Sequence, residues 1–280
     1  MMAAACMLLV ACAQQAQLRA PSARETAAIE ANNHAEASFR RGDFESAAKH
    51  YREAMRISRS LEAVDAIASN AVNLSIVFQR LGKSAEAQLS LSSVLDQDAL
   101  VFPPLRLAQA ALRRSILKLE ERQYESAAQW VEKAADQCVA PSCTLQAALY
   151  NVKAQIALEN GRADVATRYA QLALNASRDT DDQVETANAF RLLGNSALRV
   201  GNAGAALEPL AQALAIDREI GLPPKIYLDL VSLGRANTLI GKLDLARKFY
   251  ERALVVSEAS QDNQGASAVR ALLDTAGGQK

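Results

Sequence analysis

The chain has 280 residues, of which 50% are hydrophobic, 5% aromatic and 22% charged. Its 31 basic and 31 acidic side chains give a formal net charge of zero, which argues against nucleic-acid binding, because such proteins normally carry a basic surplus. Only 7 prolines and 12 glycines interrupt the chain, and no alternating run of β-branched residues indicates a strand. The composition therefore predicts an all-α protein.

The first dozen residues form an uncharged apolar stretch, MMAAACMLLVAC, which is shorter than the ~20 apolar residues of a membrane-spanning helix. Within it, Leu9–Cys12 resembles the bacterial lipobox, after which a peptidase cuts and a lipid is attached to the cysteine. The resemblance implies a signal peptide over 1–11, a lipidated Cys12 and a polar tether over 12–24. Ala13 in place of aspartate favours the outer membrane. The stretch lacks the basic residues that open a secretory signal, so a cytosolic leader is the alternative.

One four-residue pattern recurs six times along the rest of the chain. A turn residue is followed after five positions by alanine, after four more usually by a bulky residue, and after three more by a small or branched one. The turn positions are 40, 40, 39, 40 and 40 residues apart: Gly42, Gly82, Arg122, Gly161, Gly201 and Gly241. The last three positions lie on one face of a helix, and glycine permits the left-handed conformation that ends a helix. Six helical hairpins are therefore predicted.

These residues resemble the tetratricopeptide-repeat (TPR) motif, and with the lipobox they suggest a bacterial TPR lipoprotein. The resemblance implies a right-handed superhelical solenoid over 25–276, with antiparallel hairpins at about 28–61, 68–101, 108–141, 147–180, 187–220 and 227–260. An amphipathic capping helix is expected over 263–275 and a disordered tail over 277–280.

Details of the repeats predict close contacts at some places and irregularities at others. Gly194 and Gly234, seven residues before their turn positions, are expected where two helices approach most closely. Arg122 in the third repeat and the alanine-rich fourth repeat predict looser packing. Pro209 lies inside the second helix of the fifth repeat and predicts a kink.

Two further cysteines, Cys138 and Cys143, flank a short segment that contains Pro141. A disulfide is expected between them in an oxidising periplasm, and two reduced thiols are the alternative. A metal site is not expected, because zinc prefers four ligands and the two histidines, His34 and His50, are distant in sequence.

By the resemblance, the first helix of each hairpin lines a concave groove with the residues ten and six positions before the turn. The residues ten before are Asn32, Val72, Leu112, Asn151, Arg191 and Val231, and those six before are Glu36, Ile76, Ile116, Gln155, Asn195 and Arg235. An amide side chain can both donate to and accept from a peptide backbone. The candidate peptide-binding residues are therefore Asn32, Asn151, Gln155, Arg191, Asn195 and Arg235. The alternative is that the polar positions are only solvated and the apolar ones pack against neighbouring helices.

No Ser-His-Asp, HExxH or phosphate-loop pattern is present, so neither catalysis nor a cofactor is expected. The favoured function is a lipid-anchored adaptor on the periplasmic side of the outer membrane. Known TPR lipoproteins of this kind gather protein or peptide partners for pilus, secretion or cell-wall machinery. A cytosolic TPR regulator that binds a peptide or a signalling protein is the first alternative, and a substrate-recruiting subunit of an enzyme complex is the second.

Overall fold

The computed structural model describes residues 20–96, 99–138 and 143–277, and this part of the chain contains thirteen α-helices and no strand. The expected signal peptide, Cys12 and the first part of the tether lie outside the described residues. Among the helices described, none is both long and apolar enough to cross a membrane. The chain is an all-α repeat solenoid, as predicted.

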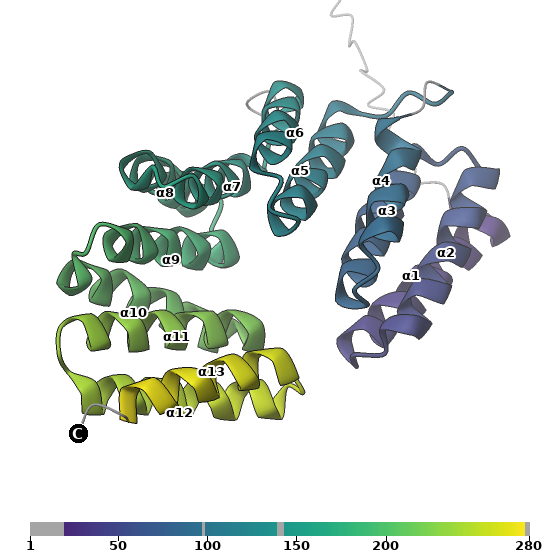
Figure 1. Ribbon diagram of the computed structural model, residues 1–280. Coiled ribbons are helices and arrows are strands. Elements are labelled where there is room, and N and C mark those ends of the chain that lie inside the picture. The colour runs from purple at the N-terminus through teal and green to yellow at the C-terminus, as the bar shows by residue number, and fades with distance from the viewer. Residues whose placement is uncertain (1–19, 97–98, 139–142, 278–280) are drawn as a thin grey trace, which may run out of the picture.

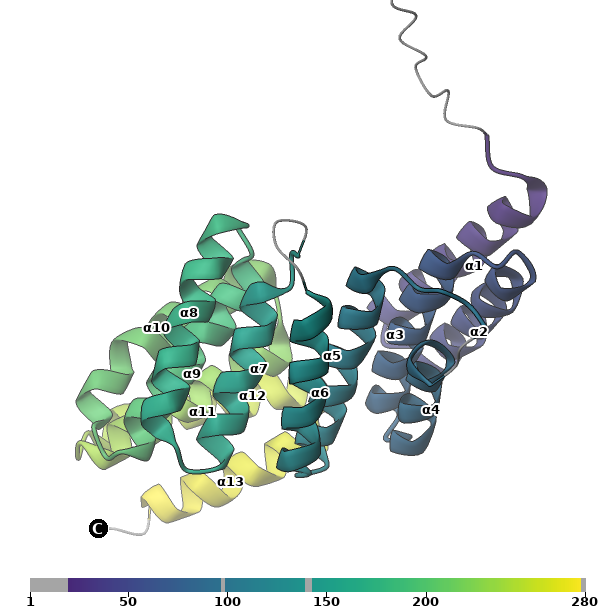
Figure 2. The same ribbon diagram turned by 90° about the horizontal axis from the view of Figure 1, so that it is seen from above.

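The helices form six antiparallel hairpins in chain order, followed by one terminal helix, and the stack bends into an arc (Figures 1 and 2). The helices are α1 (Ala23–Arg40), α2 (Phe44–Ser60), α3 (Val64–Arg80), α4 (Ser84–Leu95), α5 (Pro104–Glu120), α6 (Tyr124–Gln137), α7 (Gln146–Glu159), α8 (Ala163–Asp179), α9 (Gln183–Arg199), α10 (Ala203–Ile220), α11 (Pro223–Leu239), α12 (Leu243–Ala259) and α13 (Asn263–Gly277). The terminal helix α13 packs mainly against α12 and ends two residues later than predicted.

Most hairpins begin about one helical turn before the boundary that the sequence predicts, because their first residues suit a helix N-terminus. Ser22 caps α1 through a reciprocal capping box with Glu25. Pro104 and Pro223 are the first residues of α5 and α11, where the missing N–H of proline would be unpaired in any case. These prolines therefore start helices instead of only separating hairpins.

All six turn residues inside the hairpins adopt the left-handed conformation, including the one that is not glycine. The five glycines have φ between 69° and 78°, and Arg122 has φ 58°. In the third repeat the motif positions Ala127, Val131 and Ala134 are buried, as are the corresponding alanines of the fourth repeat. The prediction of looser packing in these repeats is therefore wrong. Packing of the two helices imposes the turn, and a non-glycine residue adopts it at a cost of about 1–2 kcal/mol.

Each hairpin is closed by a small residue seven positions before the turn, and all six are buried: Ala35, Ser75, Ser115, Ala154, Gly194 and Gly234. A Cβ atom added to Gly194 would collide with the side chain of Leu210, and one added to Gly234 would collide with the ring of Tyr250. The predicted close contacts at these two glycines are confirmed. Pro209 lies inside α10, which continues without interruption to Ile220.

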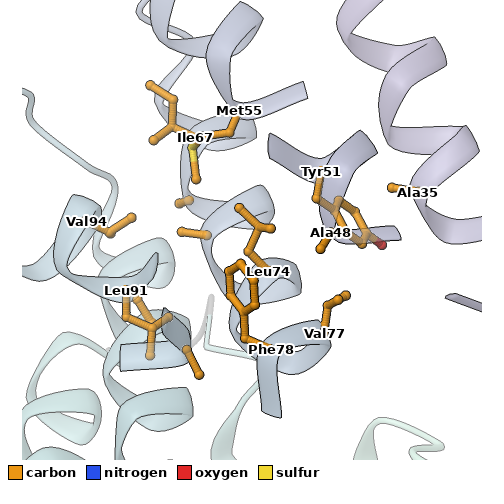
Figure 3. Packing of buried hydrophobic residues seen from close by; sticks show 14 of the residues in the cluster. Ala35, Ala48, Tyr51, Met55, Ile67, Leu74, Val77, Phe78, Leu91 and Val94 are labelled. Atoms are coloured by element: carbon orange, nitrogen blue, oxygen red, sulfur yellow. The ribbon is translucent and has the colours of Figure 1, made fainter. Parts of the chain in front are cut away.

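The core runs along the stack as successive clusters of apolar side chains, because each hairpin contacts only its neighbours. Figure 3 shows the first cluster, in which Tyr51 lies near Ala35 and Ala48, and Leu74 lies beside Phe78. Leu91 and Val94 extend this cluster from α4 toward the next hairpin. The same register positions recur in every hairpin, so the face that a residue occupies follows from its distance to the turn.

We expect Gly234→Ala to lower the free energy of unfolding by about 1–3 kcal/mol, since the added methyl group must displace the buried ring of Tyr250. Gly204→Ala is the matched control, because Gly204 is helical with open space around it and should gain up to about 1 kcal/mol. Urea denaturation of both variants measures the difference. Equal stability in the two variants would show that the contact with Tyr250 is not a close one.

Candidate binding face

Three hollows lie along the first helices of successive hairpins, and we call this surface the first-helix face. An apolar hollow of about 420 Å³ lies between α3 and α5. A small hollow of about 250 Å³ is lined by α5, α7, α9 and α11. A large hollow of about 580 Å³ is lined by α7, α9 and α11. Because every contributing helix is odd-numbered, the surface is made by the same register positions in each repeat.

Most residues that the sequence singles out for the groove line these hollows. Val72, Leu112 and Ile116 line the apolar hollow. Asn151, Gln155, Arg191 and Asn195 line the small one, and Gln155, Arg191, Asn195, Val231 and Arg235 line the large one. Asn32 lies outside all three, where its amide donates to Glu36 at 2.8 Å. Their role in binding a ligand stays a prediction.

Asn151 is buried and serves as a link between helices. Its Nδ2 donates to the backbone oxygen of Glu185 at 2.9 Å and to Glu185 Oε2 at 2.7 Å, joining α7 to the first turn of α9. Its Oδ1 is buried and has no hydrogen-bond partner among the described residues. Tertiary contacts therefore already use the donor of this amide, and the prediction that Asn151 binds a peptide stays untested.

Arg191 is likewise held inside the protein, between two buried carboxylates. Its Nε donates to Asp229 Oδ1 at 2.6 Å, and its Nη2 contacts Asp217. A third nitrogen, Nη1, donates to Asn188 Oδ1 at 2.8 Å. Lys225 also donates to that Asn188 oxygen, at 3.0 Å. The charge of Arg191 is thus neutralised within the protein, although Arg191 still lines two of the hollows, and its role in binding a peptide stays a prediction.

Burial shifts the pKa of two groups in this network, Asp229 and Lys225. Asp217 and Asp229 are 1% and 0% exposed. Burial raises the pKa of Asp229 from its ordinary 3.8 to about 7, and the hydrogen bond with Asp217 acts in the same direction, while Arg191 opposes the shift. Burial and the nearby Arg191 also lower the pKa of Lys225. Asp229 therefore keeps its proton to a higher pH than an exposed aspartate would, at the contact of α9, α10 and α11.

The raised pKa of Asp229 makes stability depend on pH with a defined sign. Between pH 3.8 and about 7 the folded protein retains a proton that the unfolded chain has lost. The contribution of Asp229 to the free energy of unfolding should therefore decrease as pH rises through this window, by at most about 1.4 kcal/mol per unit.

Urea denaturation at several pH values tests this against Asp229→Asn, in which the decrease should be absent. Asp244→Asn, which changes an exposed carboxylate on α12, should retain the dependence of the unaltered protein. The assignment of the proton to Asp229 would be wrong if the free energies of unfolding of Asp229→Asn and of the unaltered chain differed by a constant amount between pH 4 and 7.

The groups that remain available to a ligand cluster in the large hollow. Asn195 and Arg235 make no side-chain hydrogen bond or ion pair with the described part of the chain. Leu228 and Leu239 line the same hollow and are 45% and 62% exposed. An amide, a guanidinium and apolar side chains therefore surround one hollow, which suits a peptide segment with both polar and apolar groups.

Sequence reasoning missed Lys225, Asp217 and Asp229 as part of this region. A signal was present, since Asp217 and Asp229 interrupt apolar runs (ALAIDREI and YLDLVSL) at positions that a helix would bury. Which groups neutralise them could not be predicted, because Arg191 lies 26 and 38 residues away along the chain.

Cys138 and Cys143 lie between α6 and α7, where the structure joins them as a disulfide with their Cα atoms 5.1 Å apart. Oxidation of this pair in the cell stays a prediction. The rings of His34 and His50 lie 5.5 Å apart. No group of three metal-ligating side chains occurs within the described residues.

A sequence profile described as "Tetratricopeptide repeat" matches residues 25–98 and 145–219, together more than half of the chain. The chain therefore belongs to the tetratricopeptide-repeat family. Comparison with curated protein sequences finds no significant match.

Solved structures of very different sequence share the fold. The hetero-tetramer Cut9–Hcn1 of APC/C has a TM-score of 0.68 at 12% identity, covering 89% of this chain and 42% of that chain. A Rap protein complexed with competence and sporulation factor has a TM-score of 0.63 at 15% identity, covering 88% and 69%. PilF of Pseudomonas aeruginosa has a TM-score of 0.51 at 18% identity, covering 76% and 93%. At such identities the similarity shows the fold alone.

Proposed function

We propose that this protein is a non-enzymatic scaffold that binds a peptide or protein segment along its first-helix face. The family consists largely of protein-interaction scaffolds and adaptors. The observation that carries the proposal is the large hollow, where Asn195 and Arg235 have no side-chain partner among the described residues and lie among exposed apolar side chains. An amide there can hold a peptide backbone, and a guanidinium can pair with a carboxylate.

We propose further that the scaffold is a lipid-anchored adaptor on the periplasmic side of the outer membrane, where it would serve pilus, secretion or cell-wall machinery. The lipobox-like Leu9–Cys12 and the paired Cys138 and Cys143 support this location, because a disulfide is favoured in an oxidising compartment. The alternative is a cytosolic regulator that binds a peptide.

Photo-crosslinking in the cell tests the binding face. A crosslinking residue in place of Leu228 should capture a partner, whereas one in place of Val255, an exposed position on α12, should not. Asn195→Ala combined with Arg235→Ala should reduce capture at Leu228 at least about tenfold without changing thermal unfolding, since both side chains lack internal partners. Capture at Val255 alone, or capture unaffected by the double substitution, would remove the first-helix face from consideration. Asn151 is not a suitable test position, because its loss also breaks the link to Glu185.

Metabolic labelling with radioactive palmitate tests the anchor. The unaltered chain should incorporate label and fractionate with the outer membrane, and Cys12→Ser should do neither, because the thioether cannot form. Cys138→Ser is the control and should retain both properties. An unlabelled chain in the cytosolic fraction would favour the alternative regulator and leave the binding face as an independent question.

A further inference from the structure

A further hollow, of about 470 Å³, lies between the second helices α2 and α4 with α3 at its centre, away from the first-helix face. We call it the outer groove. It is lined by Arg52, Met55, Arg56, Arg59, Leu74, Phe78, Glu86, Leu89 and Ser90. Figure 3 shows Leu74 and Phe78 of α3 lying next to each other between α2 and α4. The lining is therefore basic on the α2 side, apolar at its centre and mixed on the α4 side.

The basic side of the outer groove is a stripe of arginines along α2. Arg52, Arg56 and Arg59 are spaced i, i+4 and i+7, so they share one face over two helical turns, about 10 Å. The Arg52 guanidinium lies 4.9 Å from the centroid of the Phe78 ring. Arg56 pairs with Glu53 of the same helix through two hydrogen bonds of 2.9 and 2.6 Å, and both side chains are well exposed, so a carboxylate of a partner can reach the same guanidinium. Arg59 makes no side-chain hydrogen bond or ion pair with the described residues.

We call the contact between one hairpin and the next a junction. At each of the second and third junctions, one of the equivalent positions carries an acid that pairs with a base of the following hairpin. The position of Arg56 is occupied in the second repeat by Asp96, which accepts two hydrogen bonds of 3.0 Å from Arg114 of the next hairpin. The position of Arg52 is occupied in the third repeat by Glu132, which pairs with Lys153 of the next hairpin at 2.8 Å. In both cases the second helix supplies an acid and the following first helix supplies a base.

At the first junction, between the first and second hairpins, both the second helix α2 and the following first helix α3 depart from this arrangement. Arg52 and Arg56 replace the two acids, and Leu74 occupies the position that Arg114 and Lys153 have in later repeats. At this register no base of α3 faces the second helix, whereas one does at the next two junctions. Within the described residues the acids near the arginines are Glu53, which pairs with Arg56, and Glu86 on the opposite wall. Leu89 adds an apolar side chain on the opposite wall that is 71% exposed.

We propose that the outer groove binds an acidic amphipathic helix of a partner protein. Carboxylates of that helix pair with Arg56 and Arg59, and its apolar side chains cover Leu89, Leu74 and Phe78. A helix fits because the lining residues repeat along α2 and α4 at helical spacing, so the groove follows the helix axes. The partner thus supplies at the first junction the carboxylates that Asp96 and Glu132 supply at the later ones. This surface is separate from the large hollow and binds independently of it.

The test uses the full chain and a synthetic helical peptide with leucines on one face and glutamates beside them. The matched peptide carries lysine at every glutamate position. Fluorescence anisotropy should give at least about tenfold tighter binding for the acidic peptide, with an affinity that falls as salt is raised. Asn195→Ala with Arg235→Ala should leave this binding unchanged, which separates the result from the fate of the first-helix face.

Charge-reversal variants locate the site on the protein. Arg56→Glu with Arg59→Glu should abolish the preference for the acidic peptide. Lys49→Glu with Lys248→Glu, which reverses two exposed charges outside the groove, should retain it. Leu89→Asp should also weaken binding at least about fivefold while thermal unfolding stays unchanged, because the side chain is exposed.

Two results would overturn the proposal. One is equal binding of the acidic and basic peptides, or binding that the Arg56 and Arg59 reversals leave intact. The other is a failure of the acidic peptide to bind while vesicles containing phosphatidylglycerol bind in a manner lost in the same reversals, which would assign the arginine stripe to an anionic lipid surface.

Discussion

The close approach of the two helices in each hairpin is the constraint on which the rest of this structure depends. It requires a small residue seven positions before the turn, and in the last two repeats only glycine fits beneath Leu210 and Tyr250. Once that contact forms, the turn must adopt the left-handed conformation, even where Arg122 occupies it. The face of every other residue then follows from its distance to the turn, because each helix repeats its faces at a constant spacing along the chain.

This regularity makes comparison between repeats informative. Residue types that recur at the same position in all six repeats are required for packing of the solenoid. A repeat in which such a position differs indicates another role for that residue. At the second and third junctions an acid on the second helix meets a base on the next first helix, as Asp96 meets Arg114. The arginines of α2 break that pairing in the first repeat. On the first-helix face, the fifth and sixth repeats bury an arginine between two aspartates, while Asn195 and Arg235 nearby remain free.

The fold and most of its register could be predicted from the sequence, because turn residues and small residues recur at a fixed spacing that a helix translates into faces. The candidate site could be predicted only in outline. Positions six and ten before the turn do line hollows. However, the sequence did not distinguish Asn151, which bonds to Glu185, from Asn195, which has no side-chain partner in the described part of the chain. Both are asparagines at groove positions.

By itself, the sequence determined the helical hairpins, their number and the close contacts at Gly194 and Gly234, because these depend on local conformation and on spacing along the chain. Tertiary structure alone decided which polar side chains are used internally. Arg191 meets Asp217 and Asp229 only because α9, α10 and α11 pack together, and their burial moves the pKa of Asp229 toward neutrality. Hydrogen bonds and charge pairs join residues that are distant in sequence, so they follow from the packing and not from the pattern that predicts the helices.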